Sequence, residues 1–332
     1  MSGRNFLEFL DTETRISSFR ISMSSEKMRS VSIDNINPSL KDKIKSIKDP
    51  KLKKLWEQLE NEKEPRFRIE ICAQIQILDD KDLESYTYMN YAYCKLKEFD
   101  LAEMKLEILK KIAPESFELF YCYARLHQEK KNFSESQIWW DKCLEKKPND
   151  NDVLCNKGLA LYKLGKHEEA ITYYDKALEI EPKHTSALIN KGNTFYDLGK
   201  HEEAITWYDR ALAIDAKDAS ALNNKGNALA HLGKFEEAII QYDKALAIDA
   251  NVTSALNNKG VTLGNLGKHE EAITWYDKAL AIEPNDKLAL YNKGLALYNL
   301  GKHEEAITYY DRVLEIDVTD VDALNKKGNA LY

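Results

Sequence analysis

Histidine is the residue whose spacing first suggests chemistry in this chain. Four imidazoles recur every 34 residues, and a repeated imidazole is a candidate metal ligand: they belong to His167, His201, His269 and His303. Phenylalanine holds the same place in three related stretches, at positions 99, 133 and 235. Ring packing explains both residue types, whereas metal ligation explains only histidine. We therefore predict ring packing at a turn between helices and no metal site, and we single out His231 alone as a histidine that faces a ligand.

Adjacent glutamates form a second repeated pattern, which could suggest acid–base chemistry. Residues i and i+1 of a helix do not face each other, so the two carboxylates of a pair cannot converge on one atom. Each pair stands where a helix is expected to begin, and the helix dipole stabilises negative charge at that end. We interpret all five pairs as structural: Glu168–Glu169, Glu202–Glu203, Glu236–Glu237, Glu270–Glu271 and Glu304–Glu305.

Catalytic and cofactor motifs are absent from the sequence. It contains no H-E-x-x-H, no G-x-S-x-G and no glycine-rich phosphate loop. The five cysteines are odd in number and no pair is spaced C-x-x-C, which fits neither a zinc site nor a disulfide framework: they are Cys72, Cys94, Cys122, Cys143 and Cys155. We predict that the chain is not an enzyme, binds no cofactor and works in a reducing compartment, the cytoplasm.

Charge and hydropathy exclude two classes of partner. The net charge of −7 lies in residues 151–332, which hold 21 Lys and Arg against 28 Asp and Glu. A nucleic-acid binder needs a basic stripe to neutralise phosphates, so we expect no nucleic acid. The lysine-rich stretch 41–54 is interrupted by acidic residues and is expected to be a solvated helix face. No window approaches the ~20 apolar residues of a membrane helix.

Glycine reveals the organisation of the chain. Two series with a 34-residue period account for eleven of the thirteen glycines: residues 158, 192, 226, 260, 294 and 328, and residues 165, 199, 233, 267 and 301. A fixed period of this length predicts stacked structural repeats. We number the repeat positions 1 to 34 from Asn151.

The residue types within one repeat predict a helical hairpin. Leu154, Gly158 and Leu161 share one face of a first helix, and the glycine lets a second helix come close. Gly165 supplies the left-handed conformation that ends the first helix. The second helix is expected to bury Ala170, Tyr174, Ala177 and Leu178, and Pro182 to stop it.

Residues 151–184 resemble the tetratricopeptide-repeat consensus along their whole length, with matches at Leu154, Gly158, Tyr162, Gly165, Ala170, Tyr174, Ala177 and Pro182. The resemblance implies an all-α fold, a right-handed superhelical solenoid of helix-turn-helix repeats. It also implies that the concave inside of the superhelix binds a protein or peptide. We therefore expect a protein–protein interaction scaffold that takes an extended peptide or a helix of its partner.

The same frame divides the chain into segments. We predict a variable, partly disordered segment at 1–48, a degenerate or capping helical hairpin at 49–82 and two divergent repeats at 83–150. Five regular repeats follow at 151–320, and a single final helix at 321–332. That last helix is expected to be either an imperfect cap or part of a longer array, and it could pair with a second copy of the chain.

Positions 2, 5, 9, 12 and 13 of each first helix cluster opposite the buried stripe. We call this the first-helix face, and the resemblance implies that it receives the ligand. Beside it, position 6 is asparagine in all five regular repeats. An amide both donates and accepts hydrogen bonds, so we expect these side chains to pair with a peptide backbone while tyrosines take its side chains; the alternative is that they bond locally. The predicted contacts are Asn156, Asn190, Asn193, Asn224, Asn227, Asn258, Asn292, Tyr162, Tyr196, His231, Tyr291 and Tyr298.

The sequence argues against two other functions and leaves a third open. One subtype of the family that this chain resembles grips chaperone C-termini with a carboxylate clamp. That clamp needs Lys at position 5, and no repeat here has Lys at that position. RNA binding, as in related helical repeats, conflicts with the acidic charge. The remaining alternative is a regulatory or substrate-recruiting arm of a larger enzyme or assembly.

Overall fold

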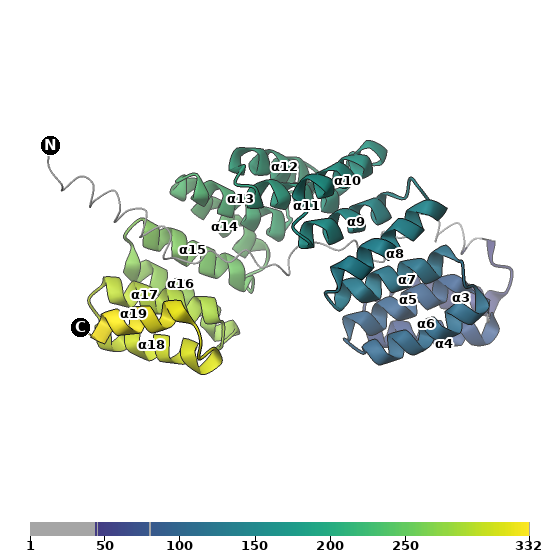
Figure 1. Cartoon of the computed structure of the whole chain (residues 1–332), viewed down its shortest axis with the longest axis horizontal. Coiled ribbons are helices and arrows are strands. Elements are labelled where there is room, and N and C mark those ends of the chain that lie inside the picture. The colour runs from purple at the N-terminus through teal and green to yellow at the C-terminus, as the bar shows by residue number, and fades with distance from the viewer. Residues whose placement is uncertain (1–43, 45, 80, 332) are drawn as a thin grey trace. The chain divides into compact units, whose positions relative to one another are not determined.

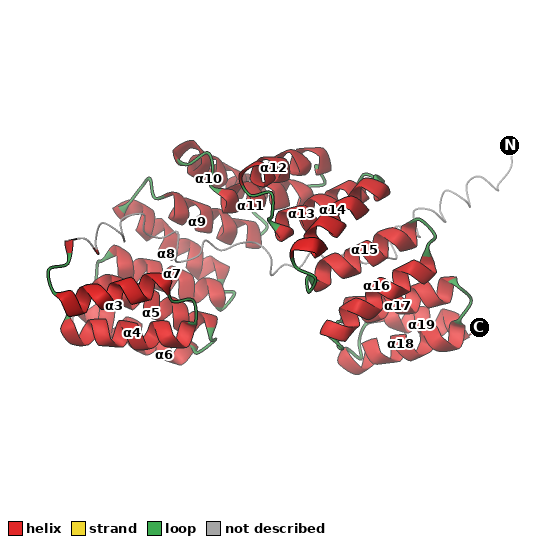
Figure 2. Ribbon diagram, turned by 180° about the vertical axis from the view of Figure 1, so that it is seen from behind, coloured by secondary structure: helices red, strands yellow, loops and turns green. Residues whose placement is uncertain are grey.

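The computed structural model describes residues 44, 46–79 and 81–331, and every regular element in that part of the chain is an α-helix. The helices alternate in antiparallel hairpins, each with a first and a second helix (Figure 2). The first helices are α3 (Pro50–Asn61), α5 (Leu83–Lys95), α7 (Phe117–Glu129), α9 (Asn151–Lys163), α11 (Thr185–Asp197), α13 (Ala219–His231), α15 (Thr253–Asn265), α17 (Lys287–Asn299) and α19 (Val321–Leu331). The second helices are α4 (Pro65–Leu78), α6 (Phe99–Ile112), α8 (Phe133–Lys146), α10 (His167–Ile180), α12 (His201–Ile214), α14 (Phe235–Ile248), α16 (His269–Ile282) and α18 (His303–Ile316). The predicted all-α solenoid of repeated helical hairpins is confirmed.

The chain falls into two compact units, one ending at Thr194 and the other running from Phe195 to the C-terminus. In the first unit each helix from α3 to α9 packs on the next, and α9 pairs with α10. In the second unit the same order runs from α12 to α19 (Figure 1). There the first helices α13, α15, α17 and α19 also touch one another in succession. Each hairpin therefore seals the apolar side of its neighbour, as expected of a repeat array.

A tyrosine packed onto a glycine lies at the centre of the regular hairpins α9–α10, α13–α14, α15–α16 and α17–α18. The rings of Tyr174, Tyr208, Tyr242, Tyr276 and Tyr310 are fully buried. A Cβ atom built on Gly158 would lie 2.6 Å from Cε1 of Tyr174, and one on Gly226 would lie 2.5 Å from Cε1 of Tyr242. The prediction that this glycine allows the second helix to approach is confirmed, and its physical reason is the ring that occupies the Cβ site.

The turn between the two helices keeps one backbone conformation along the array. Gly165 has a φ of 76°, in the left-handed region predicted for it. In the two divergent repeats the same position is Lys97, with a φ of 59°, and Lys131, with a φ of 61°. Such a φ is uncommon for a residue with a side chain. Its presence shows that the divergent repeats fold in the same register although both glycines are lost.

Several helices begin after a residue whose side chain caps the first helical turn. Asp150 accepts a hydrogen bond from the backbone N–H of Val153 at 3.0 Å, and Asp218 from that of Ala221 at 3.0 Å. The glutamate pairs lie in the first turns of α10, α12, α14, α16 and α18, as predicted. These charges therefore support the helices that carry them.

The prediction for residues 1–48 falls almost entirely outside the described residues. Of that segment, Ile44 is buried and Ile47 partly buried against the core of the first hairpins, where Trp56 and Leu59 are fully buried. The segment assignments for 49–332 remain predictions, although each predicted hairpin corresponds to a pair of helices.

Candidate functional site

The asparagines at position 6 lie between consecutive first helices and not at the surface. Asn190, Asn258 and Asn292 have no exposed area, and Asn156 and Asn224 are at most 5% exposed. Asn258 Nδ2 donates to Asn223 Oδ1 at 3.2 Å, and Asn292 Nδ2 to Asn257 Oδ1 at 3.1 Å. Each acceptor belongs to position 5 of the preceding repeat. The structure therefore gives these amides partners within the chain, and they hold the array together.

The position-6 amides nearer the N-terminus have other partners. Asn190 Nδ2 lies 3.8 Å from Cys155 Sγ, again at position 5 of the repeat before. Asn156 Nδ2 donates to the backbone carbonyl of Asp152 at 2.9 Å. Its Oδ1 lies 3.5 Å from Nη1 of the buried Arg125. Local bonding, the alternative left open by the sequence, therefore occurs at Asn156.

Most of the other predicted contacts on the first-helix face are also buried. Asn193 is 3% exposed, and Asn227 is fully buried and accepts a hydrogen bond from the hydroxyl of Tyr242 at 2.9 Å. Tyr291 is 2% exposed, with its ring 6.0 Å from that of Tyr310. Neighbouring first helices thus cover the middle of this face.

Position 13, in the last turn of the first helix, stays accessible in all five regular repeats, whereas at position 12 the predicted contact Tyr196 is only 7% exposed and Ala230 only 6%. Tyr162 and Tyr298 are half-buried there, and His231 and Asn299 are exposed. The histidine at position 17 packs behind the tyrosine, with ring centroids 5.4 Å apart for Tyr162 and His167 and 5.0 Å apart for Tyr298 and His303. The predicted ring packing is confirmed, and it orients the tyrosines. We call positions 12, 13 and 17 the tyrosine–histidine strip.

His231 joins this packing from the neighbouring repeat. Its ring stacks on His201 with centroids 4.9 Å apart, and Tyr196 meets it edge-on at 5.2 Å. Although His231 keeps exposed area, desolvation on the side of its ring packed against Tyr196 and His201 lowers its pKa, and the charge of the adjacent His201 lowers it further. Burial also lowers the pKa of His201, against the opposing effect of Glu202. Both imidazoles are therefore biased towards the neutral form, in which they can stack and exchange hydrogen bonds.

The buried His184 forms a hydrogen bond to an aspartate that sequence reasoning missed. His184 stands at the cap position of α11, where other repeats have aspartate, and its Nδ1 accepts from the backbone N–H of Ala187 at 3.3 Å. Its Nε2 therefore donates to Asp152 Oδ1 at 3.0 Å. Burial raises the pKa of Asp152, against the opposing effect of this hydrogen bond. In the sequence, this bond was indicated by a histidine at the helix-cap position where other repeats have aspartate.

The side of each hairpin away from that face carries an ordered ladder that the sequence analysis did not identify. Lysine at position 7 pairs with aspartate at position 25 of the preceding repeat, a spacing of 16 residues. The six pairs are Lys157–Asp141, Lys191–Asp175, Lys225–Asp209, Lys259–Asp243, Lys293–Asp277 and Lys327–Asp311. Aromatic rings at position 23 lie under some of these ammonium groups, as where Lys259 sits 3.8 Å from the ring centroid of Trp275. In the sequence, the ladder was indicated by the constant interval of 16 residues between each aspartate and its lysine.

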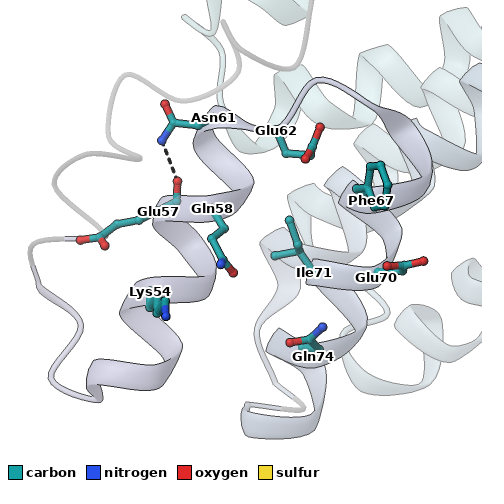
Figure 3. Close-up of a pocket in the computed structure, with 9 residues that line it drawn as sticks. All are labelled: Lys54, Glu57, Gln58, Asn61, Glu62, Phe67, Glu70, Ile71 and Gln74. Atoms are coloured by element: carbon teal, nitrogen blue, oxygen red, sulfur yellow. Dashed lines mark hydrogen bonds between the residues drawn. The ribbon is translucent and has the colours of Figure 1, made fainter.

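The hairpin α3–α4 bears a surface groove of about 580 Å³ (Figure 3). Glu57, Glu62 and Glu70 surround it, with Lys54 as its one cation, and Phe67 and Ile71 supply apolar surface. No residue of this hairpin was predicted to form a binding site. The groove suits a segment that combines positive charge with apolar side chains.

Metal-ligand clusters, thiols and membrane-spanning helices can each be checked among the described residues. No three His, Cys, Asp or Glu side chains in that part of the chain are grouped to hold a metal ion. All five cysteines are buried, and burial raises the pKa of the Cys94 thiol to about 12, which keeps it protonated and unreactive. None of the described helices is long and apolar enough to span a bilayer.

Family models match the repeats. A tetratricopeptide-repeat model matches residues 150–217 and 217–282, a TPR-repeat model matches 264–301 and a further tetratricopeptide-repeat model matches 288–320. Together they cover residues 150–320, or 171 of the 332 residues. No curated protein sequence matches this chain.

Solved structures with the same fold extend the likeness over the whole chain. The APC/C hetero-tetramer Cut9–Hcn1 matches with a TM-score of 0.69 at 17% identity, over 99% of this chain. This chain spans only 64% of that one. A tetratricopeptide-repeat protein from Parabacteroides merdae matches with a TM-score of 0.61 at 15% identity, over 75% of this chain and 99% of its own. YrrB, a TPR protein with an unusual peptide-binding site, matches at 24% identity with a TM-score of 0.45, over 57% of this chain and 97% of its own. At these identities the likeness concerns the fold.

Proposed function

This chain belongs to the tetratricopeptide-repeat family, and from that premise we propose that it is a protein-binding scaffold without catalytic function. On this proposal, it takes an extended peptide or a helix of a partner on the first-helix face. The tyrosine–histidine strip makes the contact, because Tyr162, Tyr298 and His231 are accessible within it. The buried position-6 asparagines support the face from within, by fixing the spacing of the first helices.

The observation that carries the proposal is the accessible, pre-oriented aromatic surface that each unit presents, at Tyr162 in the first unit and at Tyr298 and His231 in the second. A tyrosine offers a large apolar ring and a hydroxyl at little cost in conformational entropy, which suits recognition of peptides. The histidine behind each ring restricts its rotamers, so less freedom is lost on binding. The five free, buried cysteines fit the cytoplasm as the place where the scaffold works.

A crosslinking experiment tests this placement. A photoreactive phenylalanine analogue replaces Tyr298 in one variant and Ile248 in another; Ile248 is a half-exposed residue at the end of α14. We expect a partner to crosslink from position 298 and not from position 248. The partner's affinity should fall by about tenfold, or ~1.4 kcal/mol, in a Tyr298→Ala, His231→Ala double variant of unchanged melting temperature.

Equal crosslinking from both positions, or unchanged affinity of the double variant, would move the contact away from this strip. If the captured partner is an enzyme or a subunit of a large assembly, the chain is its regulatory or recruiting arm. That result would favour the alternative function without changing the binding surface.

A further inference from the structure

The helix α6, in the first of the two divergent repeats, carries apolar side chains on a side that its neighbours leave exposed. The helix packs on α5 and α7 through its buried residues Ala102, Leu106 and Leu109 (Figure 1). On another side, four apolar residues recur at intervals of three or four and therefore share one face: Leu101, Met104, Ile108 and Ile112. Their exposed fractions are 40%, 51%, 39% and 41%. We call these four residues the α6 stripe.

The regular repeats have mostly polar side chains at the same places. The α6 stripe occupies positions 19, 22, 26 and 30, which in α10 hold Glu169, Thr172, Lys176 and Ile180. The same order of glutamate, threonine, lysine or arginine, and isoleucine returns in α12, α16 and α18. In α14, Ile240 replaces the threonine. A continuous apolar stripe is therefore a particular feature of α6 and not a requirement of the repeat fold.

The α6 stripe is nearly symmetric about its own centre. Its outer pair, Leu101 and Ile112, and its inner pair, Met104 and Ile108, are each centred within half a residue of Leu106. A two-fold axis at that point would lay a second α6 antiparallel on the first. Leu101 would then face Ile112 of the second copy, and Met104 would face its Ile108. Such a contact uses the same surface on both copies, as two-fold contacts do.

The charges along one edge of the stripe have the same symmetry. At about 100° per residue, Asp100 and Lys111 lie about 20° apart on the helix, beside Met104. Both are exposed. In an antiparallel pair each edge meets the same edge of the second copy, so each Asp100 would lie beside the opposite Lys111. A parallel pair would set Asp100 against the other edge, where the half-buried Lys105 stands about 7 Å further along.

A lipid surface suits α6 less well than a second copy. The helix holds three lysines and three acidic residues, so its charges cancel and anionic headgroups would not attract it. Two of the acidic residues also have partners within the chain. Glu107 accepts a hydrogen bond from the hydroxyl of Tyr123 at 3.3 Å, and Glu103 pairs with Lys130.

We propose that the α6 stripe is the contact between two copies of this chain, which meet antiparallel about a two-fold axis near Leu106. The contact buries four half-exposed apolar side chains from each copy, and interfaces of such small size are weak and reversible. The stripe lies on a second helix, whereas the proposed function uses the ends of first helices. The two proposals can therefore fail separately.

Sedimentation velocity of the full chain at about 1–300 μM tests the contact. We expect a reversible dimer with a dissociation constant on the order of 10–100 μM, as for other small interfaces. Met104→Glu should raise that constant by about tenfold or more, because it would bury a carboxylate in the middle of an apolar contact. Ile240→Glu is the matched control, since Ile240 holds the same position in α14 and is 52% exposed. The control should dimerise as the wild type does.

A charge exchange tests the antiparallel arrangement. Asp100→Lys and Lys111→Glu should each weaken the dimer by about threefold or more, because each would bring like charges together. The double variant Asp100→Lys, Lys111→Glu should recover it. Its recovery could not come from a better helix, because the exchange places a cation in the first turn of α6 and an anion in the last.

Several results would overturn the inference. A chain that stays monomeric throughout this range would show that no second copy binds here. Dimers that persist in Met104→Glu would place self-association elsewhere, such as at the final helix predicted from the sequence. A double charge variant weaker than both single variants would exclude the antiparallel pair. Binding to vesicles of phosphatidylserine and phosphatidylcholine that is lost in Met104→Glu would assign the stripe to a membrane surface.

Discussion

The amide of Asn258 reaches back across one repeat and donates to Oδ1 of Asn223 at 3.2 Å, from α15 to α13. Both side chains are buried, at 0% and 2% exposure. The same relationship joins Asn292 to Asn257 in the next pair of first helices, at 3.1 Å. A polar ladder therefore runs through the seam between first helices, beside the apolar packing within each hairpin.

The first prediction concerns this ladder. Asn258→Ala should lower the free energy of unfolding by about 1–3 kcal/mol, because it removes the amide that donates to the buried Oδ1 of Asn223. Denaturant unfolding measures this, with Asn299→Ala as a matched control at an exposed asparagine. A loss of no more than the control would show that the buried amide bond contributes nothing to holding the repeats.

The second prediction concerns the close contact of Gly226 with Tyr242. Gly226→Leu should destabilise the chain by about 1–3 kcal/mol, because the new side chain would occupy the place of the tyrosine ring. Gly328→Leu is the matched control, since the same substitution there enters open space. Thermal unfolding of the two variants compares them directly, and equal melting temperatures would contradict the packing described for this hairpin.

The third prediction concerns the lysine–aspartate ladder. In a double-mutant cycle, Lys259→Met and Asp243→Asn should couple by about 0.5–1 kcal/mol, because the carboxylate is half-exposed and its charge is partly screened by water. The coupling should shrink in about 1 M salt, where exposed charges are screened within a few ångströms. A coupling that does not respond to salt would mean that the pair acts through packing.

A natural comparison exists one repeat earlier. Lys225 pairs with Asp209 at 2.6 Å, but Gln241 replaces the aromatic residue at position 23, and the lysine side chain is 20% exposed, compared with 9% for Lys259. We expect a smaller coupling for this pair, because its ammonium is better hydrated. The same cycle on Lys225 and Asp209 measures the contribution of the missing ring.

The fourth prediction concerns pH. The pKa values of His201 and His231 are both lowered below the ordinary 6.5, chiefly by burial. The unfolded chain therefore binds protons first as the pH falls, so their contribution to stability is complete above about pH 6.5 and is lost as the pH falls through the folded-state pKa values. The melting temperature should drop between about pH 7.5 and 5.5. His127, whose pKa burial also lowers, contributes in the same direction.

His201→Phe isolates the histidine pair, since phenylalanine occupies this position in sister repeats. We expect NMR titration to show a higher pKa for His231 in this variant, because the charge of His201 no longer opposes its protonation. The fall in melting temperature on acidification should become shallower. An unchanged pKa of His231 would show that burial alone sets it.

Sequence reasoning was most reliable within one hairpin. The 34-residue period, the glycine at position 8 and the apolar spacing of the second helix predicted the hairpin and its central contact, because these depend on helix geometry and residue size over about thirty residues. The ring packing of the histidines at position 17 could be predicted in the same way, because phenylalanine at this position in sister repeats identified it as a site for a ring.

Relations between hairpins required the tertiary structure. Positions 5 and 6 are about 100° apart on a helix, and the sequence cannot show how closely the next first helix approaches. In the structure that approach buries Asn258 and Tyr291, whereas Tyr298 and His231, near the ends of their helices, keep accessible area. The repeat sequence determined that hairpins form and stack, because each must bury its apolar stripe; the spacing between stacked helices decided which polar side chains are structural and which can meet a partner.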